Sequence, residues 1–216
     1  NLSLVDADVI KAAKFKVVVD GVNSTGGIAI PKLLKELGVE VVELYCEPTG
    51  HFPHNPEPLK EHLGDICALV VKEKADFGIV VDPDVDRLAF ISNDGEMFGE
   101  EYVLSKTKGN TVSNLSSSRA LRDITQKHGG TYEASAVGEV NVVAKMKTNK
   151  AVIGGEGNGG IIYPESHYGR DSLVGTALFL MLMAEKGGTV AELRASYPSY
   201  FMSKKKIELT PDLDVD

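Results

Sequence analysis

Three aspartates stand at alternate positions directly after a short apolar segment, and this arrangement constrains the fold more than any other feature of the chain. Residues 77–81 form an apolar run that predicts a buried strand, and Asp82, Asp84 and Asp86 follow it. Ligands bind at the carboxyl ends of strands in open α/β sheets. Three carboxylates this close together repel unless a cation neutralises them. The pattern therefore predicts an α/β fold with a site for a hard cation such as magnesium (Mg²⁺) at this strand end.

Strands and helices alternate along the first half of the chain. The predicted strands cover residues 15–20, 39–45 and 77–81, and apolar residues at helical spacing predict helices over 28–37 and 59–71. Residues 87–92 are expected to pair with 96–98 across Asn93-Asp94-Gly95, because Asp-Gly favours a tight hairpin. This alternation indicates a mostly parallel sheet with helices on both faces.

The same rhythm returns after residue 98. Predicted strands cover 111–115 and 130–135, two more at 151–153 and 161–163 flank a glycine-rich turn, and helices are expected over 119–128, 140–147 and 172–186. Asp171 or Ser172 is the expected cap of the last helix. The sequence thus predicts an α/β protein with two consecutive αβα-layer domains and mixed, mostly parallel sheets. We expect the boundary between residues 99 and 109, which gives domains 1–104 and 105–216.

Charge and composition exclude several classes of function. The chain has 31 acidic and 23 basic residues and a net charge of −8, so it lacks the excess of positive charge that nucleic-acid binding requires. No apolar stretch reaches the roughly 20 residues that span a bilayer, so no membrane partner is expected. Cys46 and Cys67 are too few for a disulfide framework, and a cytoplasmic location is predicted.

Two other loops carry polar residues of interest. Residues 20–27 form a glycine loop between a predicted strand and helix, and we expect a tight turn with an N-terminal helix cap. An anion-binding loop is the alternative, although the glycine spacing differs from the known phosphate-binding patterns. His51 and His54 lie in a proline-rich turn and are interpreted as surface residues.

The segment from Asp82 to Arg87, with the apolar residues 88–91 after it, resembles the metal-binding loop of the α-D-phosphohexomutase family. This family includes phosphoglucomutase, phosphomannomutase and phosphoglucosamine mutase. The resemblance implies that Asp82, Asp84 and Asp86 ligate Mg²⁺ and that Arg87 contacts phosphate or substrate, as a catalytic residue. Glycines usually separate the aspartates in the family, whereas Pro83 and Val85 stand here.

Further loops resemble the sugar-recognition domain of the same family. The glycine-rich residues 154–160 look like its sugar-recognition loop, in which Glu156 and Asn158 would bind sugar hydroxyls. Gly138 and Glu139 resemble a short substrate-binding loop, and Lys145 stands where the family often has a phosphate-contacting lysine. Arg170, just before the last predicted helix, is a possible anion contact.

The resemblance implies a phosphomutase, an isomerase of carbohydrate metabolism. Such an enzyme moves phosphate between the 1 and 6 positions of a hexose phosphate, through a phosphoserine and a hexose 1,6-bisphosphate intermediate. The chain resembles only the two central domains of the family. The phosphoserine domain and the C-terminal phosphate-binding domain would be missing flanking partners, so we expect no turnover by this chain alone.

Two alternatives stay open at this point. A metal-dependent module that binds sugar phosphates without turnover accounts for the same motifs. A haloacid-dehalogenase-type phosphatase also opens its site with Asp-x-Asp after an apolar strand, and Asp82 would then be the nucleophile.

Overall fold

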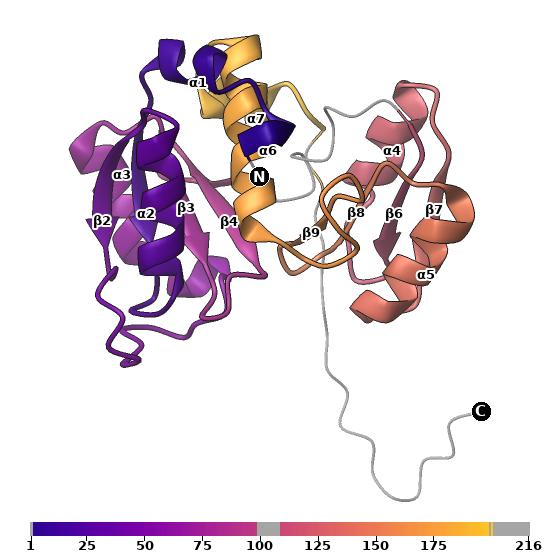
Figure 1. The fold of residues 1–216 in the computed structure, drawn as a ribbon, viewed down its shortest axis with the longest axis horizontal. Coiled ribbons are helices and arrows are strands. Elements are labelled where there is room, and N and C mark those ends of the chain that lie inside the picture. Colours follow the sequence, from indigo (N-terminus) through magenta and orange to yellow (C-terminus); the bar gives the residue numbers. More distant parts are fainter. Residues whose placement is uncertain (1, 99–108, 199, 201–216) are drawn as a thin grey trace, which may run out of the picture.

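The computed structural model describes residues 2–98, 109–198 and 200 of the 216-residue chain. These residues form two α/β/α units, each built on its own sheet (Figure 1). Both sheets have a parallel centre and an antiparallel edge, which confirms the predicted fold class. The expected boundary, residues 99–109, falls almost entirely outside the described residues, so the division into 1–104 and 105–216 stays a prediction.

The first sheet has the strand order β2-β1-β3-β4-β5. Its strands are β1 (Lys16–Asp20), β2 (Glu40–Leu44), β3 (Phe77–Val81), β4 (Leu88–Ser92) and β5 (Met97–Phe98). β1 pairs in parallel with β2 and β3, and β4 returns antiparallel beside β3. The predicted hairpin is present: Ile91 pairs with Met97, and Gly95 has a φ of +81° in the turn.

Alternate residues of the first sheet bury themselves against different helices. Val17 and Val19 belong to a core with residues of α2 (Gly26–Glu36), whereas Val18 belongs to a core with residues of α3 (Gly64–Glu73). This two-residue alternation is what a strand covered on both faces requires.

The single helix predicted over residues 59–71 is wrong. A short 3₁₀ helix, η2 (Lys60–His62), comes first, and α3 begins only at Gly64. Leu63 separates the two with φ −105° and ψ 21°, outside regular helical geometry, while its side chain is buried in the α3 core. Leu59, at the start of the predicted helix, is 38% exposed.

The second sheet has the strand order β7-β6-β8-β9. Its strands are β6 (Thr111–Asn114), β7 (Tyr132–Ser135), β8 (Ile153–Glu156) and β9 (Gly160–Ile162), with helices α4 (Ala120–Lys127) and α5 (Glu139–Asn149). The glycine-rich turn is shorter than predicted, because Gly154 and Gly155 belong to β8. A Cβ on Gly154 would lie 2.5 Å from Sδ of Met146, so glycine lets α5 pack close to this strand.

The long helix α6 (Ser172–Lys186) has the predicted bounds, and Asp171 is its cap, with Oδ1 accepting from the Val174 amide at 3.0 Å. α6 lies beside β4 of the first sheet (Figure 1). The ring centroid of Phe179 is 5.2 Å from that of Phe77 and 4.0 Å from that of Phe90. A helix from the second half of the chain therefore completes the core of the first sheet.

The remaining helices frame this core. They are η1 (Leu2–Leu4), α1 (Ala7–Ala13) and α7 (Val190–Ala195). α7 is fastened to the β4–β5 turn, where Asn93 accepts from the Ala191 amide at 3.0 Å and Asp94 pairs with Arg194 at 2.6 Å. In the part of the chain that the structure describes, no helix combines the length and apolarity needed to cross a bilayer.

Candidate metal and ligand site

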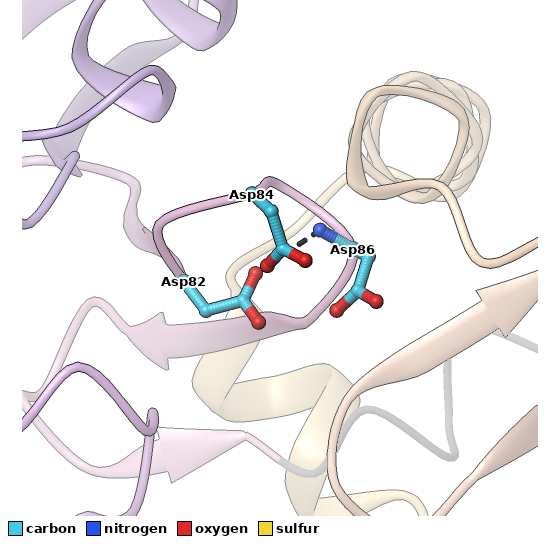
Figure 2. Close-up of side chains that lie close together, drawn as sticks. All are labelled: Asp82, Asp84 and Asp86. Carbon is cyan, nitrogen blue, oxygen red and sulfur yellow. Dashed lines mark hydrogen bonds between the residues drawn. The ribbon is translucent and has the colours of Figure 1, made fainter. Parts of the chain in front are cut away.

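The loop of residues 82–87 leads from β3 to β4 and gathers the three predicted aspartates (Figure 2). One carboxylate oxygen from each of Asp82, Asp84 and Asp86 lies within 4.8 Å of the others. Asp82 is 5% exposed, Asp86 is half-buried and Asp84 is exposed. The structure thus brings together the three side chains that the sequence singled out. We call residues 82–87 the metal loop.

Hydrogen bonds from backbone amides to the Asp82 carboxylate give the metal loop its shape. Oδ1 of Asp82 accepts from the amides of Asp86 at 3.0 Å and Arg87 at 2.9 Å. Val85 has a φ of +63°, a left-handed conformation that costs a residue with a side chain about 1–2 kcal/mol. Val85 therefore adopts the left-handed conformation that glycine adopts at little cost. The loop keeps its turn in this way although no glycine stands between the aspartates.

The first glycine loop braces the metal loop from the side. The hydroxyls of Ser24 and Thr25 both donate to the carbonyl of Pro83, at 3.0 and 2.6 Å. The predicted helix cap is wrong, because Thr25 at the start of α2 makes no side-chain hydrogen bond to the helix. Its hydroxyl holds the metal loop instead.

The electrostatics of the metal loop fit a hard cation. Burial raises the pKa of the Asp82 carboxyl to about 7, and the charges of Asp86 and Asp84 add to this rise while the Arg87 amide opposes it. Oδ1 of Asp86 is buried and has no hydrogen-bond partner among the described residues. An all-oxygen donor set with one uncompensated carboxylate oxygen is suited to Mg²⁺.

Arg87 is held at the edge of the metal loop by two carboxylates. Its Nη1 lies 3.3 Å from Oε1 of Glu57, and its Nε lies 3.6 Å from Oδ2 of Asp82. Glu57 was not among the residues predicted from the sequence. Its place in the proline-rich turn is the only sequence signal for it. In the structure, the Glu57 amide donates to Oδ1 of Asn55 in this turn at 3.0 Å.

The glycine-rich loop reaches the metal loop from the second sheet. The Leu88 amide donates to the Gly159 carbonyl at 3.0 Å, and Arg87 and Gly160 form an antiparallel bridge. We call residues 154–160 the sugar loop, after the family loop it resembles. Residues that are about 70 positions apart in the sequence are therefore joined by backbone hydrogen bonds at the site.

Glu156 of the sugar loop is buried, with 6% of its surface exposed, and both its oxygens are engaged. Oε1 accepts from Asn114 Nδ2 at 2.8 Å and from the Gly138 amide at 3.2 Å, and Oε2 lies 3.0 Å from Nη1 of Arg170. Arg170 also forms ion pairs with Asp86 and Glu139. The structure thus brings Gly138, Glu139 and Glu156 together with the metal loop.

Two other predicted residues lie differently. Lys145 is on α5, and its Nζ is 3.2 Å from Oε2 of Glu133 on β7. Asn158 is in the turn of the sugar loop, and its Oδ1 is buried without a hydrogen-bond partner among the described residues. The contacts of these two residues with phosphate and sugar stay predictions.

His54 is not the surface residue that we expected. Its side chain is 14% exposed, and Nε2 lies 3.0 Å from Oδ2 of Asp20, which is buried at the carboxyl end of β1. Nδ1 lies 2.7 Å from the carbonyl of Asn55. His54 therefore ties the proline-rich turn to the sheet, whereas His51 is exposed, as expected.

Comparison with known families gives two matches that adjoin each other along the chain. Residues 2–95 match the family model described as phosphoglucomutase/phosphomannomutase, alpha/beta/alpha domain II. Residues 97–200 match the model for alpha/beta/alpha domain III of the same proteins.

Individual proteins show the same likeness. The chain is 34% identical, over 96% of its length and 48% of the relative's, to a phosphoglucomutase/phosphomannomutase of Thermococcus kodakarensis. Its fold resembles a phosphoglucomutase/phosphomannomutase family protein of Burkholderia thailandensis, with a TM-score of 0.78, 27% identity, and coverage of 89% of this chain and 46% of that one. An Aspergillus fumigatus N-acetylphosphoglucosamine mutase, solved with GlcNAc-6P and magnesium, shares the fold at a TM-score of 0.65 and 14% identity, with coverage of 89% and 51%. The chain spans about half the length of these relatives.

Proposed function

Because the chain belongs to the α-D-phosphohexomutase family, we propose that it is the metal- and sugar-binding centre of a phosphohexomutase. The complete protein would move phosphate between the 1 and 6 positions of a hexose phosphate through a phosphoserine and a hexose 1,6-bisphosphate. The observation that carries the proposal is the meeting of two loops from separate sheets. Three clustered carboxylates stand on one, and the buried Glu156 stands on the other.

In this proposal Asp82, Asp84 and Asp86 hold Mg²⁺. Bound there, the cation would offset negative charge on the phosphoryl group that is transferred. The buried, unpartnered Oδ1 of Asp86 supports this assignment, since a bound cation would satisfy it. Arg87 presents a guanidinium beside the carboxylates, fixed by Glu57, and is suited to a phosphate oxygen.

The second unit supplies the sugar contacts in this proposal. The Gly138 amide, just before Glu139 at the start of α5, donates to Glu156 of the sugar loop, and Asn158 stands in the same loop. The amide and carboxylate groups of these four residues match sugar hydroxyls. Lys145 would meet a phosphate after release from Glu133. We also propose a cytoplasmic location, which the two free thiols Cys46 and Cys67 support.

The two alternatives differ in what they ask of the structure. A phosphatase nucleophile must be accessible, whereas Asp82 is 5% exposed and its Oδ1 already accepts two amides. These contacts favour a metal ligand over a nucleophile. A sugar-phosphate-binding module without turnover describes what we expect of the chain by itself, since both flanking domains of the family lie outside its matched residues.

The experiment that tests the proposal is a ³¹P NMR titration of glucose 1-phosphate and glucose 1,6-bisphosphate with the chain in Mg²⁺. We expect broadened or shifted phosphate signals, which report binding, and no conversion of the 1-phosphate to the 6-phosphate. Unchanged phosphate signals in Mg²⁺ would contradict the proposal, and conversion by the chain alone would contradict the expected lack of turnover.

A further inference from the structure

Arg170 is the one described residue whose side chain forms ion pairs with three carboxylates of the site. Its Nη2 pairs with Oδ2 of Asp86, its Nη1 lies 3.0 Å from Oε2 of Glu156, and its Nε lies 3.3 Å from Oε2 of Glu139. The side chain is 16% exposed. One guanidinium therefore links the metal loop, the sugar loop and the first turn of α5.

The surrounding backbone fixes the path of the Arg170 side chain. A Cβ on Gly160 would lie 2.3 Å from Cδ of Arg170, so the aliphatic part of the arginine crosses β9 where glycine leaves room. Arg170 also forms an antiparallel bridge with Ile162, and its amide donates to Oε1 of Glu139 at 3.3 Å. Contacts of the Arg170 backbone and of its aliphatic side chain therefore fix the position of the guanidinium.

The carboxylate partners of Arg170 differ in the other hydrogen-bond donors that they have. Glu156 has Asn114 and Gly138 as further donors. Asp86 has Arg170 at one oxygen, and its other oxygen is buried without a partner. A cation in the metal loop and the guanidinium of Arg170 would therefore draw on the same carboxylate, and two positive charges this close repel each other.

We propose that Arg170 is a positioning residue that lowers the affinity of the site for the cation and raises its affinity for the sugar. By occupying Asp86 it weakens Mg²⁺ binding at the metal loop, and by holding Glu156 it orients that carboxylate for the sugar. This inference rests on the proposed function and deepens it. A residue that only stabilised the fold would affect both ligands in the same direction, whereas this role predicts opposite effects.

The test is calorimetric titration of Arg170→Met, which keeps an unbranched apolar side chain in place of the aliphatic part of the arginine and removes the charge. We expect Mg²⁺ to bind about fivefold more tightly than to the unmodified chain, because a competing partly buried ion pair is gone. Glucose 1,6-bisphosphate, titrated in saturating Mg²⁺, should bind about tenfold more weakly, because Glu156 loses a charge-assisted hydrogen bond that orients it.

Two further variants separate charge from geometry. Arg170→Lys keeps the charge but has no planar fork to reach two carboxylates, so Mg²⁺ affinity should stay near that of the unmodified chain while bisphosphate affinity falls. Arg194→Met removes an arginine that pairs with Asp94 between α7 and the β4–β5 turn, and should leave both affinities unchanged. Circular dichroism melting curves establish that each variant is folded.

The outcomes are distinct. Weaker binding of both ligands to Arg170→Met, or no change in either, would overturn the inference while leaving the proposed function in place. The same holds if Arg170→Lys, being folded, binds the bisphosphate like the unmodified chain. Failure of the unmodified chain to bind either ligand would overturn the proposed function and the inference with it.

Discussion

The amide of Leu88 donates a hydrogen bond to the carbonyl of Gly159, with 3.0 Å between the two atoms. Leu88 opens β4 directly after the metal loop, and Gly159 belongs to the turn of the sugar loop. Both positions are buried. A bond between two buried backbone groups fixes how far the two loops stand apart, because an unmade bond would leave both groups without a partner.

Gly159 is required at this contact for two reasons. Its φ is +95°, and a Cβ would lie 2.5 Å from the carbonyl oxygen of Leu88. We expect Gly159→Ala to lower the free energy of unfolding by at least about 2 kcal/mol, from backbone strain and from the clash together. Urea denaturation measures the change.

Gly129→Ala is the matched control. Gly129 has a φ of +79° and no heavy atom near the position of a Cβ, so its substitution introduces the strain without the clash. We expect a loss of about 1 kcal/mol. Equal losses at the two positions would show that the contact with Leu88 contributes nothing.

Phe179 connects the second half of the chain to the core of the first sheet. Its ring lies among Phe77, Phe90 and Phe98 of the first sheet, although α6 belongs to the second half of the sequence. We expect a single calorimetric transition for the chain, and a loss of about 3–5 kcal/mol in Phe179→Ala. Val140→Ala, at an 81% exposed position of α5, should change stability by about 0.5 kcal/mol or less. Two separate transitions in the unmodified chain would contradict this account.

The raised pKa of Asp82 predicts a pH-dependent stability for the cation-free chain. An unfolded aspartate has a pKa of about 3.9, whereas burial raises that of Asp82 to about 7. Between about pH 4 and pH 7 the folded chain therefore binds a proton that the unfolded chain has lost, so this contribution to stability falls as the pH rises. Each pKa unit corresponds to about 1.4 kcal/mol.

Melting temperatures in EDTA from pH 5 to pH 8 test this expectation. The comparison is with Asp82→Asn, in which an amide oxygen still accepts from the Asp86 and Arg87 amides but no proton is gained or lost. The unmodified chain should lose stability relative to the variant as the pH rises, with the loss complete above about pH 8. Parallel curves would show that Asp82 ionises normally.

The sequence predicted those features that depend on local patterning. A strand covered on both faces is apolar at nearly every position, so β1 and β3 were predicted from their short apolar runs. The metal loop was singled out because three aspartates directly after a buried strand repel one another unless a cation neutralises them. α6 was predicted with its bounds because its cap, its apolar run and Gly187 all lie within the segment itself.

Long-range packing was not predictable in the same way. Nothing within α6 indicates that Phe179 packs on a sheet built about 90 residues earlier. His54 was interpreted as a surface residue because its partner Asp20 lies 34 residues away in the sequence. Arg170 was only a possible anion contact, because its three carboxylates come from three segments that lie apart in the sequence. Such pairs arise from the chain topology, which a single sequence does not display.

A Mg²⁺ titration by calorimetry of the unmodified chain and Asp84→Asn tests whether the metal loop binds a divalent cation. Asp84 is exposed, so its substitution removes a proposed ligand and a charge without disturbing the core. Asp8→Asn, on α1 before the first strand, is the control. We predict one Mg²⁺ site in the unmodified chain and in the control, and at least tenfold weaker binding in Asp84→Asn. Equal binding by all three proteins, or none by any, would contradict a divalent-cation site in the metal loop.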